Sequence, residues 1–158
     1  KRVDRKIGMI HKKLYAGENL AAIEMKDYFS HLADYIVDAF GMQNQVDIAV
    51  NMKELELDVD IAIPIGLIVN ELLVNSLKYA FPDNRRGKIH ISLKQTGTLV
   101  QLDVKDDGIG HKKENKAIET GFGTRLIKLL TKQLEGKMLL NIDQGTHVSI
   151  QFKCNKAA

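Results

Sequence analysis

The sequence has no tryptophan and a single cysteine, and aromatic residues make up only 6% of it. With so few aromatic residues, the core must consist mostly of Leu, Ile and Val. The lone Cys154 excludes an intramolecular disulfide and a cysteine-based zinc cluster, and it fits a reducing compartment. A strong excess of one charge is also missing. The net charge is +3 and no block of Lys and Arg is present, so we expect no nucleic-acid binding.

Long apolar runs are missing as well. None of them predicts a transmembrane helix, and no signal peptide is visible. The 158 residues suffice for one domain with a hydrophobic core. Because the first residue is Lys and not Met, we expect a fragment of a longer protein. We expect this part to be cytoplasmic and without membrane contact of its own, although the parent protein could be membrane-anchored.

Apolar residues at helical spacing predict four helices. The first covers residues 1–15 and is basic. The second covers residues 26–40, is capped by Gly41, and buries a stripe of five residues: Tyr28, Leu32, Tyr35, Ile36 and Ala39. A third, long helix has Pro64 in its first turn, where the missing N–H does no harm, and it stops near residues 81–84. The fourth covers residues 124–134 and turns five residues inward: Leu126, Ile127, Leu129, Leu130 and Leu134.

Alternating apolar and polar residues predict the strands. One strand covers residues 46–52, and a short extended segment follows at 54–57. Two hairpins come later: residues 89–94 with 100–104, and residues 137–142 with 146–153. The alternation indicates that one face of the sheet is buried and the other faces water, which predicts an α+β fold with two layers. The helix over 1–15 precedes this unit, so we place a domain boundary between residues 22 and 23.

Polar residues follow one face of the long third helix. Glu71, Asn75, Lys78 and Tyr79 lie at positions i, i+4, i+7 and i+8. The amide oxygen of Asn75 could bind Mg²⁺, the Lys78 amine could meet a phosphate, and the Tyr79 ring could lie against a base or sugar. A surface helix that is polar only for solubility carries the same residue types, so the segment alone leaves both interpretations open.

An acidic, glycine-containing segment directly follows a predicted strand. In it, Asp106 precedes Gly108 and Gly110, which allow a tight turn and a close approach to a ligand. A carboxylate fixed at a strand end in an apolar pocket can accept a hydrogen bond from the amino group of adenine. A plain turn after a strand is the alternative for this segment.

A second glycine-containing segment opens the fourth helix, with Gly121, Gly123 and Thr124. Glycines before a helix expose its first amides, which can bind phosphate. The segment is not a Walker A loop, because no Gly-Lys-Ser/Thr follows, and it is not a Rossmann fingerprint, because the glycines do not follow a strand. A loop with an N-cap threonine is the alternative.

Taken together and in this order, the three segments resemble the N, G1 and G2 boxes of the GHKL (Bergerat) ATP-binding fold. Sensor histidine kinases, type II topoisomerase ATPase domains, a stress chaperone family and mismatch-repair ATPases share this fold. The string over residues 70–82 and the short segment between Gly110 and Gly121 are similar to the histidine kinases. Residues 121–136 are similar to the bacterial subclass whose phosphoacceptor helix reads His-Arg-x-Lys-Asn-Asn.

The resemblance implies a two-layer α/β sandwich, with a mixed, mostly antiparallel sheet covered on one face by helices. Residues 1–22 would be a remnant of the dimerisation and phosphoacceptor bundle, and residues 23–158 would be the ATP-binding catalytic domain. The parent protein would act as a homodimer. The cofactors implied are ATP and Mg²⁺.

The resemblance also implies roles for single residues. Asn75 would coordinate Mg²⁺, and Glu71 would take the place of a general base or water-orienting acid. Lys78 would contact phosphate, Tyr79 would pack near the adenine or ribose, and Asp106 would accept from the adenine amino group. The remaining positions would surround the ligand: Gly108 and Gly110 by close approach, Gly121, Gly123 and Thr124 at the phosphates and lid end, and Thr146 near the base.

The function implied is that of the catalytic domain of a bacterial two-component sensor histidine kinase. It would transfer the γ-phosphoryl group of ATP to a histidine on an upstream helix, for relay to a response regulator. The acceptor string is absent here, and His11, on the second bundle helix of the resembled pattern, is not the expected acceptor. Asp107 stands where many kinases have Asn, which could alter phosphate or magnesium contacts.

Three other functions stay open. The first is a GHKL ATP hydrolase in which Glu71 activates water. The second is a nucleotide-binding module that only regulates a partner. The third is an anti-sigma-factor serine kinase, which the helix over residues 1–15 disfavours.

Overall fold

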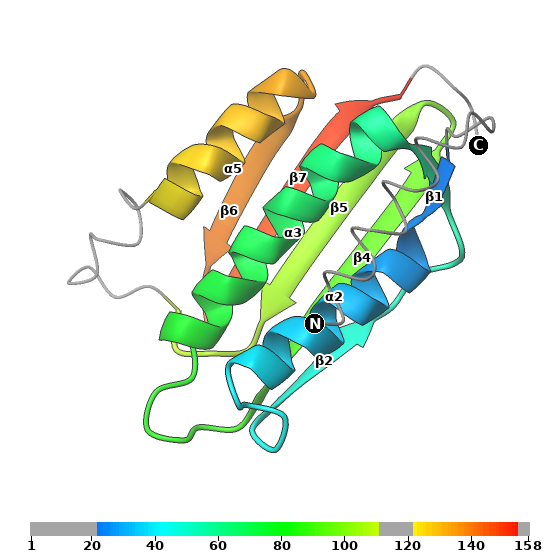
Figure 1. The fold of residues 1–158 in the computed structure, drawn as a ribbon. Helices are drawn as coiled ribbons and strands as arrows, with labels where there is room; N and C mark the ends of the chain where they lie inside the picture. Colours follow the sequence, from blue (N-terminus) through cyan, green and yellow to red (C-terminus); the bar gives the residue numbers. More distant parts are fainter. Residues whose placement is uncertain (1–21, 111–121, 155–158) are drawn as a thin grey trace.

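The computed structural model describes residues 22–110 and 122–154, so the helix expected over residues 1–15 lies outside the described part. The elements run in the order β1 (Ala22–Glu24), α2 (Met25–Ala39), β2 (Val46–Val50), β3 (Glu56–Asp58), α3 (Val59–Tyr79), β4 (Gly87–Thr96), β5 (Leu99–Asp106), α5 (Phe122–Gln133), β6 (Lys137–Ile142) and β7 (Thr146–Lys153). Five strands form one sheet in the order β2-β4-β5-β7-β6, and α2, α3 and α5 lie on one of its faces (Figure 1). The expected two-layer α+β fold is confirmed.

The sheet is mixed because β2 pairs with β4 in parallel, while the other pairs are antiparallel. Both predicted hairpins are present, as β4–β5 and β6–β7. Alternate residues of β4, β5 and β7 face the helices and are buried: Ile89, Ile91, Leu93, Val100, Leu102, Val104, Val148, Ile150 and Phe152. The register places Ile89 opposite Asp106, so that Asp106 continues the inward-facing row of β5.

Helix α2 has well-formed ends. Glu24 at its N-cap accepts hydrogen bonds from the backbone amides of Lys26 (2.7 Å) and Asp27 (3.3 Å). Gly41 follows the C-cap with a positive φ of 63°, as expected for a capping glycine. The predicted stripe is wrong in part, because the helix buries Met25, Phe29, Leu32, Ala33, Ile36 and Val37. The real stripe is rotated toward Phe29, which leaves Tyr28 and Tyr35 half-buried and Ala39 exposed.

Helix α3 begins at Val59, so the prediction that Pro64 lies in its first turn is wrong. Inside a helix, proline removes the hydrogen bond to the carbonyl four residues back, here that of the exposed Asp60, where solvent can replace it. By length and composition alone, α3 is long and apolar enough to cross a membrane. This corrects the expectation that no segment of the chain is. In this fold the apolar side of α3 packs in the core, where Ile65, Ile68, Val69 and Leu73 are fully buried.

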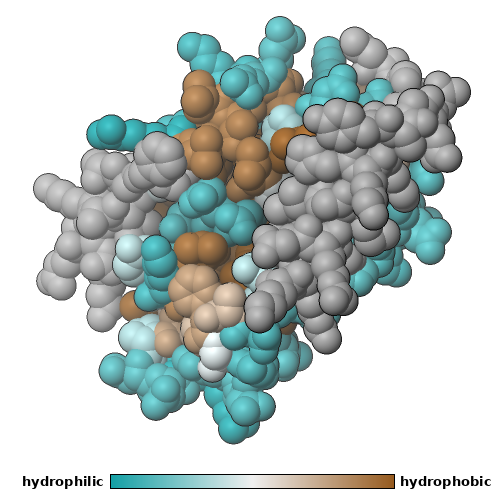
Figure 2. Space-filling view, viewed as in Figure 1, coloured by the Kyte–Doolittle hydropathy of each residue, from teal (hydrophilic) through white to brown (hydrophobic). Residues whose placement is uncertain are grey.

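Some apolar side chains remain exposed on the helix-covered face. Leu129 of α5, predicted to turn inward, is 54% exposed, and Ile63 and Leu67 of α3 are each 43% exposed. Figure 2 shows apolar atoms gathered on this face of the molecule. Of the five residues predicted inward on α5, Ile127 and Leu130 are buried, and Leu126 and Leu134 pack partly against the core.

A second, small sheet pairs β1 with β3 in antiparallel fashion, with Ala22 opposite Asp58. The sequence predicted β3 only as a short extended segment and did not predict β1. The boundary between residues 22 and 23 stays a prediction, because residues 1–21 lie outside the described part.

Candidate nucleotide-binding site

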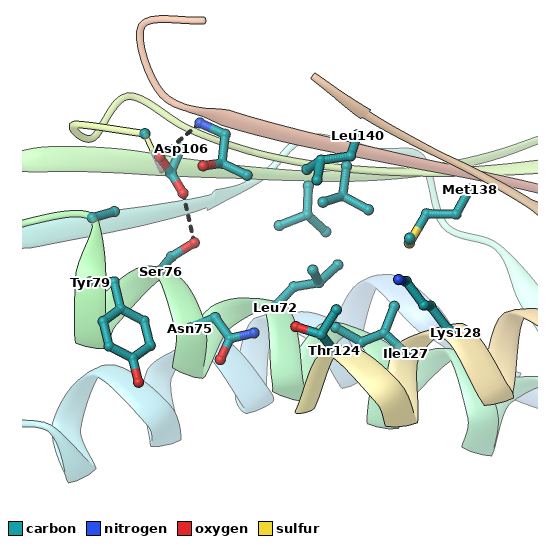
Figure 3. Close-up of a pocket in the computed structure, with 15 residues that line it drawn as sticks. Leu72, Asn75, Ser76, Tyr79, Asp106, Thr124, Ile127, Lys128, Met138 and Leu140 are labelled. Carbon is teal, nitrogen blue, oxygen red and sulfur yellow. Dashed lines mark hydrogen bonds between the residues drawn. The ribbon is translucent and has the colours of Figure 1, made fainter. Parts of the chain in front are cut away.

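A cavity of about 370 Å³ lies between α3, α5 and the inner face of β5, β7 and β6 (Figure 3). Its apolar lining comes from all these elements: Leu72, Ala80, Val104, Ile127, Met138, Leu140 and Val148. Its polar lining contains six of the residues singled out from the sequence: Asn75, Tyr79, Asp106, Gly110, Thr124 and Thr146. The three sequence segments therefore meet in one place, although they lie far apart along the chain.

Asp106 is the most constrained polar residue of the cavity. Its side chain ends the inward row of β5 and is only 3% exposed. Oδ1 accepts hydrogen bonds from the backbone amides of Gly108 (3.0 Å) and Thr146 (3.1 Å), and Oδ2 accepts one from the Ser76 hydroxyl at 2.8 Å (Figure 3). All three donors are neutral. A buried carboxylate held in this way is fixed in orientation and keeps its acceptor character toward a ligand.

Two glycines shape the backbone around this carboxylate. A side chain at Gly108 would collide with the Cβ and the carbonyl oxygen of Ala80 at the end of α3. Gly108 is buried and does not line the cavity. Its missing side chain therefore makes room for the end of α3 and not for the cavity. Gly145, which the sequence marked only as part of a turn, has a φ of 123°, and a side chain there would collide with the Asp106 carbonyl.

Helix α3 presents only part of the predicted polar face to the cavity. Asn75 and Tyr79 line it, whereas Glu71 is half-buried, Lys78 is exposed, and neither lines it. Since successive residues are about 100° apart around a helix, Glu71 and Lys78 lie roughly 100° around α3 from Leu72 and Tyr79, which line the cavity. Of these two, Leu72 is buried, whereas the ring of Tyr79 points away from the sheet and is 43% exposed (Figure 3). Ser76 lies on the side of Leu72, four residues later, and was not singled out from the sequence.

Helix α5 supplies the opposite wall. It begins at Phe122, so Gly123 and Thr124 belong to its first turn, while Gly121 lies outside the described part. Thr124 and Lys128, one turn apart, both line the cavity. Among the described residues that line it, Lys128 is the one cation and Asp106 the one anion. The sequence did not single out Lys128, although the i+4 spacing from Thr124 would have indicated it.

Asp107 has a structural role at the edge of the site. Its Oδ1 accepts a hydrogen bond from the Lys88 amide (2.8 Å), and its carbonyl accepts one from Arg85 Nη2 (3.0 Å). Asp107 therefore ties the end of β5 to the start of β4, and its side chain does not line the cavity.

The donor set of the cavity suits a metal ion that arrives with a ligand. The described residues contain no group of three or more His, Cys, Asp or Glu side chains that could hold a metal. Oxygens are nevertheless offered by Asn75 and Thr124 at the cavity wall. Mg²⁺ keeps several water molecules and is usually bound by one or two protein oxygens together with substrate phosphates. These residues fit Mg²⁺ in that form.

The outer face of the same sheet carries a second carboxylate, Asp103. Its Oδ1 lies 2.9 Å from His147 Nε2, and its Oδ2 accepts a hydrogen bond from Gln101 at 2.8 Å. Partial burial acts to raise the pKa of Asp103, but hydrogen bonds from His147, Gln101 and Ser149 outweigh it, so that the pKa lies below its usual value.

Comparisons with known proteins agree with this architecture. A family model described as "Histidine kinase-like ATPase domain" matches residues 44–152. Blue-light-activated histidine kinase 2 of Erythrobacter litoralis (strain HTCC2594) is 28% identical over 125 residues, which cover 78% of this chain and 35% of that protein. The chain thus spans about a third of that relative's length.

Solved structures show the same fold. The histidine kinase domain of the Erythrobacter litoralis EL346 blue-light activated histidine kinase superposes with a TM-score of 0.75 at 24% identity, covering 96% of this chain and 74% of that one. A mycobacterial sensor histidine kinase, MprB, superposes with a TM-score of 0.65 at 16% identity, covering 84% of this chain and 95% of that one.

Proposed function

Since this chain belongs to the histidine kinase-like ATPase domain family, we propose that its cavity binds ATP with Mg²⁺ and that the domain is the catalytic part of a sensor histidine kinase. It would transfer the γ-phosphoryl group to a histidine on an upstream helix, for relay to a response regulator. The observation that carries the proposal is the buried Asp106, fixed by three hydrogen bonds in a cavity that also presents Asn75 and Thr124.

The base of the nucleotide fits the Asp106 part of the cavity. The carboxylate accepts a hydrogen bond from the exocyclic amino group of adenine, and the flanking Val104 and Val148 offer apolar surface to the ring. Tyr79 is 43% exposed and lines the cavity, so that it can pack against the base or ribose at the cavity mouth. Thr146, whose amide holds Asp106, can place its hydroxyl near the base.

The phosphates fit between α3 and α5. Asn75 would hold Mg²⁺ through its amide oxygen, and the ion would supply positive charge that stabilises the phosphates. Thr124 lines the other wall, and the first amides of α5 would bind the phosphates there. Gly123 in the first turn of α5, and Gly121, which lies outside the described part, are proposed for the lid end. Lys128 adds a positive charge from one turn further along.

Phosphoryl transfer requires mainly positioning and charge stabilisation, and this inventory supplies both. Glu71 lies one turn before Asn75 and is the candidate for accepting the proton of the attacking group, once its side chain turns toward the cavity. Lys78, being exposed, would reach phosphate only from the cavity rim. The acceptor histidine, the homodimer and the cytoplasmic location belong to the parent protein and are part of the proposal.

Isothermal titration calorimetry and labelled ATP test this function. We expect Mg²⁺-dependent ATP binding, little self-phosphorylation, and transfer of label to an added domain that carries the upstream phosphoacceptor helix. Binding without transfer to any such helix would refute the kinase assignment. Fast phosphate release that Glu71→Gln abolishes would instead identify an ATP hydrolase. ATP binding indifferent to Mg²⁺ and to Asn75→Ala would identify a regulatory module.

A further inference from the structure

Ser76 makes a contact that the proposed function does not require in itself. Its hydroxyl donates a 2.8 Å hydrogen bond to Oδ2 of Asp106 (Figure 3). Ser76 also lines the cavity, and its backbone is fixed within α3 between the buried Leu73 and Leu77. The contact therefore joins a rigid core helix to the end of strand β5.

The hydrogen bonds of Asp106 leave few places for a ligand. A carboxylate offers about four lone-pair sites, two on each oxygen. Oδ1 has both sites taken by the amides of Gly108 and Thr146, and Oδ2 has one taken by Ser76. One acceptor site on Oδ2 remains. The hydroxyl hydrogen of Ser76 points to Asp106, so Ser76 Oγ also offers only lone pairs to the cavity.

We propose that Ser76 is a positioning residue that sets base specificity: it restricts Asp106 to a single acceptor site and lines that site with a second acceptor oxygen. Such a site favours a purine with an amino group at carbon 6, as in ATP. It disfavours a purine with a carbonyl there, because three acceptor oxygens would face one another without a proton between them. This inference rests on the proposed binding of ATP.

In Ser76→Ala, we expect the affinity to fall for ATP but not for a nucleotide that lacks the amino group. Without the hydroxyl, the carboxylate is less well oriented, and water can occupy the freed site on Oδ2. We expect ATP binding to weaken roughly tenfold, the scale of a hydrogen bond to a charged group. Purine ribonucleoside triphosphate, which lacks the amino group, makes no bond to Asp106 and should bind Ser76→Ala and the unaltered chain alike.

The test measures the affinities of ATP, GTP and purine ribonucleoside triphosphate with Mg²⁺ for five proteins. These are the unaltered chain, Ser76→Ala, Ser76→Cys, Ser76→Thr, which keeps a hydroxyl, and Ser92→Ala, a matched change on the outer face of β4. We expect Ser76→Ala to narrow the preference for ATP over the other two nucleotides most, and Ser76→Thr and Ser92→Ala to leave it unchanged. Urea unfolding of each variant confirms that it is folded, and Ser76→Cys, with a weaker donor, should give an intermediate loss.

Two results would overturn the inference while the proposed function stands. The first is an equal loss for all three nucleotides, which indicates a merely structural role. The second is unchanged ATP affinity in Ser76→Ala and Ser76→Cys while the unaltered chain binds ATP. If the unaltered chain binds no nucleotide, the proposed function fails, and the inference fails with it.

Discussion

Asp103 and Asp106 lie three residues apart on β5 but on opposite faces of the sheet. Asp103 faces the side of the sheet opposite α2, α3 and α5 and lies 2.9 Å from His147 Nε2. Asp106 faces the helices, is 3% exposed, and is held only by neutral donors. The same residue type thus occupies a partly exposed position beside a histidine and a buried position whose described hydrogen-bond donors are all neutral.

The difference separates a structural carboxylate from one that is available to a ligand. On the outer face, the His147 imidazole lies 2.9 Å from Oδ1 and the Gln101 amide donates to Oδ2 at 2.8 Å, so little is gained by binding anything else. On the inner face, burying a carboxylate without a cation is costly, and it is tolerated because three hydrogen bonds satisfy its oxygens. Buried polar groups that a fold retains at such a cost gather at functional sites.

The largest effect is expected when the charge of each aspartate is removed in turn. In Asp106→Asn, an amide hydrogen would meet donors that already point at the carboxylate, so ATP affinity should fall about 100-fold, or about 2.8 kcal/mol. In Asp103→Asn, ATP affinity should be unchanged. Isothermal titration calorimetry measures both.

The outcome can contradict the assignment in one clear way. Equal losses in Asp103→Asn and Asp106→Asn would show that charge anywhere on β5 matters, and not the buried carboxylate of the cavity. Thermal unfolding of both variants separates lost binding from lost folding.

A second prediction concerns the packing that places Asp106. In Gly108→Ala, the new methyl group would collide with Ala80 at the end of α3, and overpacking of this kind typically costs about 1–3 kcal/mol. The control is Gly97→Ala in the β4–β5 turn, where the space is open and only the positive φ of 62° is strained. Urea unfolding should show a larger loss for Gly108→Ala. Equal losses would mean that the contact with Ala80 costs no more than the backbone strain at position 97.

A third prediction sharpens the role of the α3 wall. Because Asn75 is half-buried and lines the cavity, Asn75→Ala should leave stability nearly unchanged and weaken Mg²⁺-dependent ATP binding about tenfold. Asn141→Ala, on the exposed edge strand β6, is the matched control and should have no effect. A titration of ATP at several Mg²⁺ concentrations measures the change, and a loss independent of Mg²⁺ would argue against Asn75 as the metal-binding residue.

The sheet could be predicted well from the sequence because alternation is a direct readout of one buried face. The final hairpin, residues 137–142 with 146–153, has the predicted bounds. Helix positions were less predictable. Pro64 marks a helix start only on average, and here α3 begins five residues earlier. The stripe of α2 was placed one residue off because Tyr28 is amphipathic and suits a stripe margin as well as its centre.

The site was predictable where a residue's type is tied to one backbone position. Asp106, at the end of a strand, and Thr124, at a helix start, both line the cavity. Lys78 does not line the cavity. A polar residue on a long helix can lie on any side that faces water, so its type alone does not predict which side that is. Ser76 and Lys128 were not predicted, since their function depends on which side of each helix the sheet covers, and that depends on tertiary packing.

The smallest expected effect lies on the outer face, at the pair of Asp103 and His147. Because the pKa of Asp103 is lowered in the folded protein, its carboxylate contributes stability that is present above the unfolded pKa of about 3.9. That stability is lost as the pH falls through the lower, folded pKa. Asp103→Asn lacks this contribution, so the difference in unfolding free energy between the two proteins should shrink below about pH 4. Since the pair is partly exposed, the difference at neutral pH should not exceed about 1 kcal/mol. Urea unfolding at pH 6 and at pH 3 measures it, and a difference that stays constant between them would show that folding does not lower the pKa of Asp103.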